Sequence, residues 1–391
     1  MKILIFATTF GADLLSFTHY AEQQEGVEIK ISLTNSELFK KEGINEILPI
    51  KSELVERDWK QNLGKIKGFN PDITIMDNKI PLRKTSPKAL ILWHGYGWKG
   101  PNDEEEFKWL HRNVQLSWGD MKTPNHDIKW QCFGPIDFEH RSKISGFHPD
   151  NCVQLGSASQ DYLRKPIDKE RLQKFYPFDV VNKKTVLLAP TWHYGEVFAH
   201  WGRDEEIFNR LINFLEEHNA NLILRLHDSF RFDNKYLKFL EELQEKHPSI
   251  LLKFKDRNPD NFLDMQVSDV LVTNFSSIAN LYYATGRPTV HIYPVKSEDE
   301  AFMQRRHTIF GSVTKKIESV KFIWKYSPED NGGLLSRSAE EMLEQIRFAL
   351  ENPDCCKEQS KNYLDKHMLG ADGKNCERIW LEVNNLVKSP K

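Results

Sequence analysis

Two neighbouring serines, Ser276 and Ser277, stand where a short buried-type strand gives way to a helical pattern. The strand is residues 270–273, and Ile278 and Leu281 follow at the spacing of one helix face. The start of a helix leaves backbone amides without partners, and two hydroxyl donors beside them suit a phosphate. The pattern predicts a phosphorylated small-molecule ligand. Serine is also a common helix cap, so capping alone is the competing explanation.

Two histidines, His94 and His227, each follow a short apolar run that reads as a strand. Open α/β sheets hold ligands at the carboxyl ends of their strands, and imidazole suits proton transfer near neutral pH. Arg225 lies two residues before His227 and so shares its face of the strand. These positions predict a cleft with His94 as candidate general base. The alternatives are a histidine bonded to the backbone at 94 and a ring bonded to Asp228 at 227.

The segment Gly95–Gly100 matches the G-x-G-x-x-G pattern of dinucleotide-binding folds, and Asp120 is expected to end the next strand at about the required distance. Bulky Tyr96 and Trp98 would crowd such a turn. The four acids 103–106 at the expected helix start would repel a pyrophosphate. We therefore disfavour a nicotinamide cofactor and expect no cofactor.

Short apolar runs alternate with amphipathic stretches in two series, which predicts parallel sheets with crossover helices. The strands of the first series are expected at Ile3–Ala7, Val27–Leu33, Ile73–Met76, Ala89–Trp93 and Val114–Trp118. Those of the second are expected at Thr185–Ala189, Asn221–Leu226, Ile250–Phe254, Val270–Thr273 and Thr289–Ile292, with helices at Asp204–His218 and Asn234–His247. Thr191 offers a hydroxyl just after the first strand of the second series.

The length of 391 residues and the polar segment 164–182 between the two series favour two domains. We expect an N-terminal domain at 1–165 and a C-terminal domain at 166–370. Residues 371–391 are expected to form a terminal helix that could pack back on the N-terminal domain.

Composition excludes several classes of protein. A formal net charge of −2 offers no global attraction to nucleic acid. Five cysteines without paired zinc spacing fit a reducing cytoplasm, and no apolar run reaches the roughly 20 residues of a membrane span. No Asp-X-Asp pair occurs and the histidines lack close ligand spacing, so we expect no catalytic metal. A basic face could meet an anionic lipid surface, although a solvated charged face is the simpler interpretation; its lysines are Lys40, Lys41, Lys51, Lys60, Lys65 and Lys67.

An ordered set of short motifs between His94 and Trp380 resembles the CDP-glycerol glycerophosphotransferase family of teichoic-acid and capsule polymer synthesis. The motifs are Trp93-His94-Gly95 with Lys99, Ala189-Pro190-Thr191-Trp192, Leu226-His227, Asn274-Phe275-Ser276-Ser277, Gly286-Arg287-Pro288, and Asp372-Gly373-Lys374 before Arg378. No single motif is specific, but their order and spacing both agree with the family.

The resemblance implies a GT-B architecture, in which two Rossmann-like domains with parallel sheets face an interdomain cleft. It implies transfer of a polyol phosphate from CDP-glycerol or CDP-ribitol to a hydroxyl of a lipid-linked or polymer acceptor, with CMP leaving. His94 would take the acceptor's proton, Gly95 and Lys99 would lie on the acceptor side, and the C-terminal domain would hold the donor. The donor and phosphate contacts would come from His227, Thr191, Arg225, Thr273, Asn274, Ser276, Ser277 and Arg306.

Four positions depart from the family pattern. Asn274 replaces an acid, Phe275 a tyrosine, His193 an arginine and Asp228 a proline. These departures keep two alternatives open: a GT-B glycosyltransferase that uses a nucleotide sugar, and a catalytically silent nucleotide-binding module. The expected location is the cytoplasm, with peripheral contact at the inner face of the membrane as an option.

Overall fold

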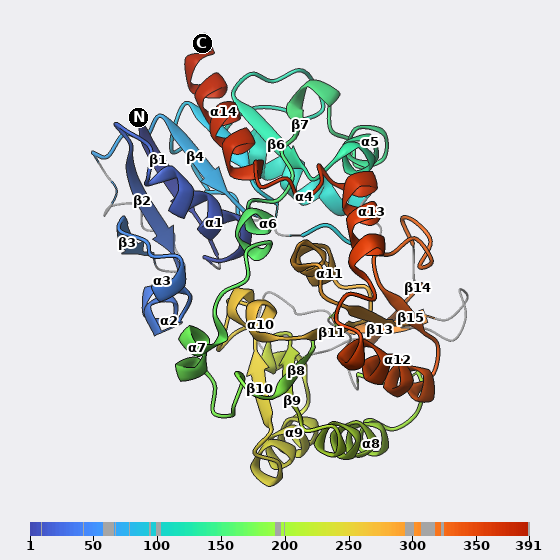
Figure 1. Cartoon of the computed structure of the whole chain (residues 1–391). Coiled ribbons are helices and arrows are strands. Elements are labelled where there is room, and N and C mark those ends of the chain that lie inside the picture. Colours follow the sequence, from blue (N-terminus) through green and yellow to red (C-terminus); the bar gives the residue numbers. More distant parts are fainter. Residues whose placement is uncertain are drawn as a thin grey trace.

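The chain folds into two halves, each built on a parallel sheet with helices on its faces (Figure 1). The computed structural model describes residues 1–8, 10–41, 43–57, 66, 68–77, 79–93, 95–98, 103–191, 197–198, 200–293, 301–305, 317–321 and 324–389. The expected α/β fold with two parallel sheets is therefore confirmed.

Within the described residues the N-terminal sheet has seven strands in the order β3-β2-β1-β4-β5-β6-β7, all parallel. The strands are β1 (Lys2–Phe6), β2 (Glu28–Leu33), β3 (Glu53–Glu56), β4 (Ile73–Met76), β5 (Lys88–Ile91), β6 (Ile128–Cys132) and β7 (Cys152–Gln154). The helices are α1 (Ala12–Ala21), α2 (Ser36–Lys41), α3 (Ile44–Ile47), α4 (Glu104–Gln115), α5 (Pro135–Lys143) and α6 (Ala158–Leu163). The strands β4 and β5 are buried throughout, as expected when helices cover both faces of a parallel sheet.

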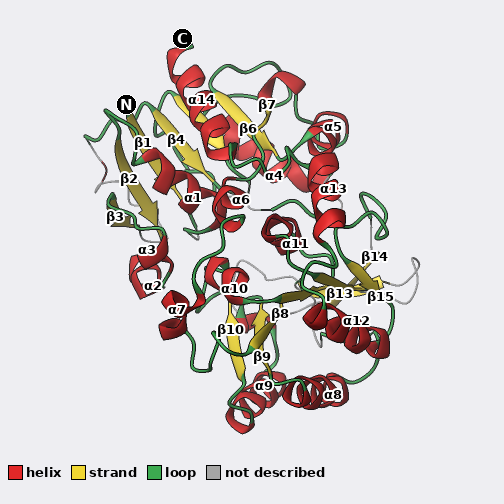
Figure 2. Cartoon of the chain, in the orientation of Figure 1, coloured by secondary structure: helices red, strands yellow, loops and turns green. Residues whose placement is uncertain are grey.

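The C-terminal sheet has six strands among the described residues, in the order β10-β9-β8-β11-β12-β15 (Figure 2). The strands are β8 (Lys184–Leu188), β9 (Ala220–Leu226), β10 (Ile250–Phe254), β11 (Val270–Thr273), β12 (Thr289–Ile292) and β15 (Leu334–Ser336), and β13 (Ala301–Arg305) pairs separately with β14 (Ile317–Lys321). The helices are α7 (Lys169–Leu172), α8 (Asp204–Glu217), α9 (Asn234–Lys246), α10 (Phe262–Val267), α11 (Ile278–Tyr282), α12 (Ala339–Glu351) and α13 (Lys357–His367).

The last helix, α14 (Asn375–Lys388), returns to the N-terminal half and lies against α1 and α6 (Figure 1). The backbone amides of Asn375 and Cys376 donate to the carboxylate of Asp161 in α6. Ile379 and Val383 are fully buried on the inner face of α14. The chain therefore crosses between the two halves twice.

The strand expected at Val114–Trp118 is wrong, because Val114 belongs to α4. Phe107, Leu110 and Val114 are buried at the i, i+3, i+7 spacing of a helix face, and this helical stripe overrides the short apolar run at its end. Asp120 follows α4 and does not end a strand, since the next strand is β6. The strand-end acid that a dinucleotide-binding motif would need at this position is therefore missing.

Candidate active site

A cavity of about 380 Å³ lies between the two halves, where the carboxyl ends of strands from both sheets meet. Parallel sheets expose backbone groups and loop side chains at that edge, which is why ligands bind there. From the N-terminal half the wall includes Thr8, Asp77 and Trp93; from the C-terminal half it includes Thr191, His227, Lys255, Ser276 and Ser277. The predicted cleft is therefore present, and Ser276, Ser277 and His227 line it.

Ser276 and Ser277 occupy the turn between β11 and α11. Ser277 is at the N-cap position of α11 but makes no side-chain capping bond. Within the described residues neither hydroxyl has a hydrogen-bond partner, and both serines line the cavity. Capping therefore does not explain these side chains, and their hydroxyls are available to a ligand.

The residue before this pair, Phe275, has a left-handed backbone with φ of +62°. A bulky residue adopts this conformation at a cost of about 1–3 kcal/mol, and only where its surroundings hold it. The Phe275 ring is buried and stacks on His291 at 4.6 Å between ring centroids, with Trp98 at 5.6 Å. This packing fixes the turn that presents Ser276 and Ser277.

His227 lines the cavity directly after β9. Its Nδ1 atom lies 2.6 Å from a carboxylate oxygen of Asp228. The backbone amide of Asp228 also donates to Nδ1, at 2.9 Å, so it is the backbone of Asp228 that orients the ring. His227 therefore has both a structural partner and access to a ligand.

Arg225 reaches the cavity wall, but its guanidinium is already bonded inside the protein. One nitrogen donates to the carboxylate of Asp264 at 2.9 Å, and another donates to the carbonyl of Asn258. Lys253 also contacts Asp264, at 2.6 Å. Arg225 belongs to a buried ion-pair cluster, so its predicted role as a direct phosphate ligand loses support.

Thr273 and Asn274 are fully buried and, as the described residues outline it, do not line the cavity. The hydroxyl of Thr273 donates to the carbonyl of Ala189 at 2.7 Å. The side-chain oxygen of Asn274 accepts from the backbone amide of Thr191. The expected donor contacts of Thr273 and Asn274 are replaced by bonds that tie the ends of β8 and β11 together.

His94, Lys99 and Arg306 lie outside the described residues, but the neighbours of position 94 are well placed. Trp93 lines the cavity. Gly95 approaches the C-terminal half so closely that a methyl group on its Cα would lie 2.7 Å from the hydroxyl oxygen of Ser277. The strand-end segment after β5 therefore touches the serine turn after β11.

Three charged residues of the cavity wall were not predicted: Asp13 in α1, and Asp77 and Lys255 at strand ends. Asp77 follows β4 and Lys255 follows β10, so the strand-end position that singled out the histidines would also have found them. Burial raises the pKa of the Asp77 carboxyl, against backbone hydrogen bonds from Lys79 and Thr8 and the charges of Arg57 and Lys255. Asp77 and Lys255 bring opposite charges from the two halves to one cavity.

Among the described residues, no group of three or more His, Cys, Asp or Glu side chains is arranged to hold a metal ion. Nor does that part of the chain contain a helix of the length and apolarity that a membrane span requires.

Comparison with known proteins identifies relatives of the chain. A family model described as CDP-glycerol:poly(glycerophosphate) glycerophosphotransferase matches residues 142–385, more than half of the chain. The teichoic acid ribitol-phosphate polymerase TarK of Staphylococcus aureus (strain NCTC 8325 / PS 47) is 23% identical over 248 residues, which cover 62% of this chain and 42% of TarK. The chain spans about two fifths of the length of the curated relatives it matches.

Among solved structures, a variant of the wall teichoic acid polymerase TagF matches with a TM-score of 0.69 and 14% identity, over 99% of this chain and 89% of that one. A TagF variant soaked with CDPG matches with a TM-score of 0.67 and 15% identity, again over 99% and 89%. At this level of identity the likeness shows a shared fold, which is the predicted GT-B arrangement.

Proposed function

The chain belongs to the CDP-glycerol:poly(glycerophosphate) glycerophosphotransferase family, and from this premise we propose that it transfers glycerol phosphate or ribitol phosphate from a CDP-activated donor to an acceptor hydroxyl. The acceptor oxygen attacks the phosphorus that carries the polyol. The bond from that phosphorus to the bridging oxygen breaks, and CMP leaves. This transfer needs an activated hydroxyl and hydrogen-bond donors for the charge that gathers on the leaving phosphate.

The contact between Gly95 and Ser277 is the observation that carries the proposal. It brings the segment after β5, where a proton acceptor is expected at His94, against the turn that presents two unoccupied hydroxyls. A base and an anion site on opposite sides of one cavity suit phosphoryl transfer between two bound molecules.

In the proposed site, Ser276 and Ser277 hydrogen-bond the donor diphosphate, His227 lies beside it, and Lys255 adds positive charge. His94 takes the acceptor's proton, Gly95 and Lys99 belong to the acceptor side, and Arg306 contacts the diphosphate. Thr191 and Arg225 line the same cavity and would face the donor, while Thr273 and Asn274 serve as the framework behind these groups. Residues 1–165 would form the acceptor domain and residues 166–370 the donor domain.

The acceptor in this proposal is a lipid-linked chain or a cell-surface polymer. The protein would therefore work in the cytoplasm, in peripheral contact with the inner face of the membrane.

A thermal-shift comparison of CDP-glycerol, CDP-ribitol, CMP and a UDP-sugar tests the donor class, because a ligand that binds the folded state raises the melting temperature. We expect the CDP-polyols to raise it most. An assay for CMP release then tests turnover. A shift with the UDP-sugar together with release of a nucleoside diphosphate would replace the proposal by a glycosyltransferase, and binding without turnover would indicate a silent module.

Replacing His94 by alanine tests the base. Binding of the CDP-polyol should persist, while turnover falls by about 10² or more, a typical contribution of general base catalysis. His218→Ala, an exposed histidine at the end of α8, is the matched control and should keep wild-type turnover. Full turnover in His94→Ala would remove this residue from the mechanism.

A further inference from the structure

The segment 95–98, which follows the expected base, is held mainly by residues of the C-terminal half. The backbone amide of Lys325 donates to the carbonyl of Trp98 at 2.6 Å, and the side-chain amide of Asn280 donates to the carbonyl of Tyr96. The side chains of Tyr96 and Trp98 are buried, with 3% and 0% exposed. The segment has no regular secondary structure, so these bonds from other elements determine its position.

Three side chains form a hydrogen-bonded chain behind this segment. The Tyr96 hydroxyl lies 3.2 Å from Nδ1 of His367, and Nε2 of His367 lies 2.8 Å from the carboxylate of Asp330. The carbonyl of Asp330 accepts the indole N–H of Trp98 at 2.7 Å. Asp330 therefore holds both aromatic residues of the segment, one through its backbone and the other through His367.

The arrangement also selects a tautomer of His367. Burial lowers the pKa of this histidine, against the opposing effect of Asp330, and so favours the neutral ring. A carboxylate only accepts hydrogen bonds, hence Nε2 carries the proton and donates to Asp330. Nδ1 is then an acceptor, and the Tyr96 hydroxyl donates to it.

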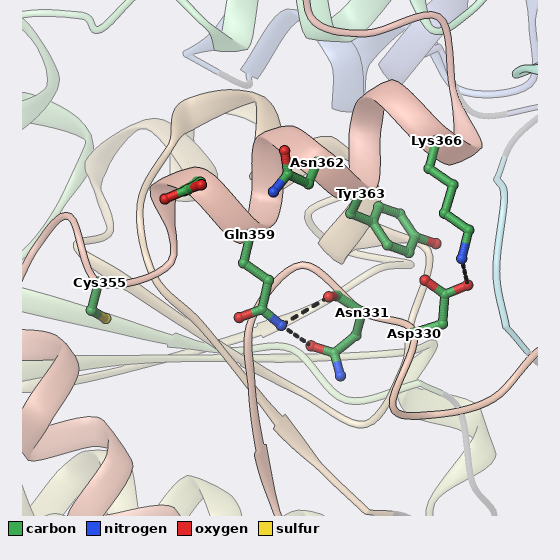
Figure 3. A pocket seen from close by; sticks show the side chains of 8 residues that line it. Asp330, Asn331, Cys355, Gln359, Asn362, Tyr363 and Lys366 are labelled. Atoms are coloured by element: carbon green, nitrogen blue, oxygen red, sulfur yellow. Dashed lines mark hydrogen bonds and ion pairs between the residues drawn. The ribbon is translucent and has the colours of Figure 1, made fainter.

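His367 is itself fixed by both halves of the molecule. It ends α13 and stacks on Tyr363, with 4.2 Å between ring centroids. On its other side, a methyl group on Gly134 would overlap the His367 carbonyl oxygen, so the two backbones are in direct contact. The half-exposed Lys366 also pairs with the Asp330 carboxylate, at 2.7 Å. Figure 3 draws this ion pair.

We propose that Tyr96, His367 and Asp330 are positioning residues that hold the segment after β5 in register with Ser277. The proposal rests on the proposed transferase function, and it assigns a task to side chains that touch no substrate. Small displacements of a reacting group reduce rates strongly, by about 10²-fold per Å in unfavourable cases. Loosening this segment should therefore lower turnover while leaving the donor site on the C-terminal half intact.

Tyr96→Phe is the test, because it removes one hydroxyl and keeps the ring. We expect kcat to fall about tenfold, with the dissociation constant of the CDP-polyol within twofold of wild type. The matched control is Tyr282→Phe, since Tyr282 is also buried in the same hydrophobic cluster but donates to the backbone carbonyl of Ser268, 3.1 Å away, and not to this network. This control should keep its kcat.

The double variant Tyr96→Phe/His367→Phe checks that the two residues act through one bond. If they do, it should be no slower than His367→Phe alone. Multiplicative losses in the double variant, an unchanged kcat in Tyr96→Phe, or an equal loss in the Tyr282→Phe control would each overturn the proposal.

Hydrogen exchange supplies a readout that needs no turnover. The backbone amide of Lys325, which donates to the carbonyl of Trp98, should exchange at least tenfold faster in Tyr96→Phe than in wild type or in Tyr282→Phe. A wild-type protein that turns over no CDP-polyol would refute the proposed function, while this measurement would still report on the positioning chain. Equal exchange in all three proteins would refute the positioning chain and leave the function untouched.

Discussion

At the scale of single residues, the contact between Gly95 and Ser277 depends on the absence of a side chain. Gly95→Ala would place a methyl carbon 2.7 Å from the Ser277 hydroxyl oxygen and 3.0 Å from its Cβ, which is closer than such atoms normally approach. We expect kcat/KM to fall about tenfold or more as the segment and the serine turn are pushed apart. Steady-state kinetics with the CDP-polyol measures this loss.

Gly97→Ala is the control for that prediction. No described atom lies within 4 Å of a methyl group at Gly97, and the segment on either side is unchanged. This variant should retain turnover within about twofold of wild type. Similar kinetics for the two alanine variants would mean that the approach of Gly95 to Ser277 has no role in the reaction.

At the scale of secondary-structure elements, α10 is joined to β9 and β10 by the buried cluster of Asp264, Arg225 and Lys253. Asp264→Asn removes the carboxylate that both cations contact and leaves Asp260 to offset their charge. Breaking a buried ion pair in this way destabilises a protein by about 3–5 kcal/mol. Chemical denaturation should show this loss at pH 7. The exposed pair Lys143–Glu139 is the control, and Glu139→Gln should change stability by less than about 1 kcal/mol.

The same cluster predicts that the free energy of unfolding depends on pH. Burial alone would raise the pKa of the Asp264 carboxyl, but Lys253 and Arg225 together outweigh it, and the pKa lies below its usual value. A carboxyl with a depressed pKa stabilises the fold above its unfolded pKa of about 4, and this contribution is lost as the pH falls through the lower, folded value. The stability gap between wild type and Asp264→Asn should therefore be full at pH 6 and narrow below about pH 4. A gap that stayed constant down to the acid transition would contradict this assignment.

A strand or helix could be predicted from the sequence where a short run of neighbouring residues is enough to specify it. Strands such as β4 and β8 are continuous apolar runs, and both were expected at nearly their observed bounds. β6 was missed because Lys129 and Gln131 interrupt its apolar pattern. Gln131 is fully buried and donates to Asp13, a residue 118 positions away. No local pattern reveals such a pairing, so a strand with a polar residue in its middle is easily taken for a loop.

At the scale of the whole molecule, the return of α14 to the N-terminal half is held by its buried face. Ile379→Ala would leave a void between α14 and its neighbours and should lower the free energy of unfolding by about 2–5 kcal/mol. Leu381 lies on the same helix with 55% of its surface exposed, so Leu381→Ala should change stability by less than about 1 kcal/mol. Urea denaturation of the two variants tests whether this contact stabilises the fold. Equal effects would mean that it does not.

The candidate site was predictable where it depends on strand ends and unpredictable where it depends on partners brought in by the fold. The positions of Ser276, Ser277 and His227 in the cavity follow from their places after β11 and β9. Arg225 is paired with Asp264, which lies 39 positions further along the chain. A sequence pattern cannot show that a cation already has such a partner.

The burial of Tyr96 and Trp98 in the C-terminal half has a consequence for how ligands come and go. Swinging the two halves wide apart would draw both rings into water, at about 1.5–3 kcal/mol for each large apolar side chain, in addition to the broken hydrogen bonds. We therefore expect nucleotides to enter and leave through small rearrangements at the rim of the cleft. The contact of Tyr96 and Trp98 with the C-terminal half should persist throughout each catalytic cycle.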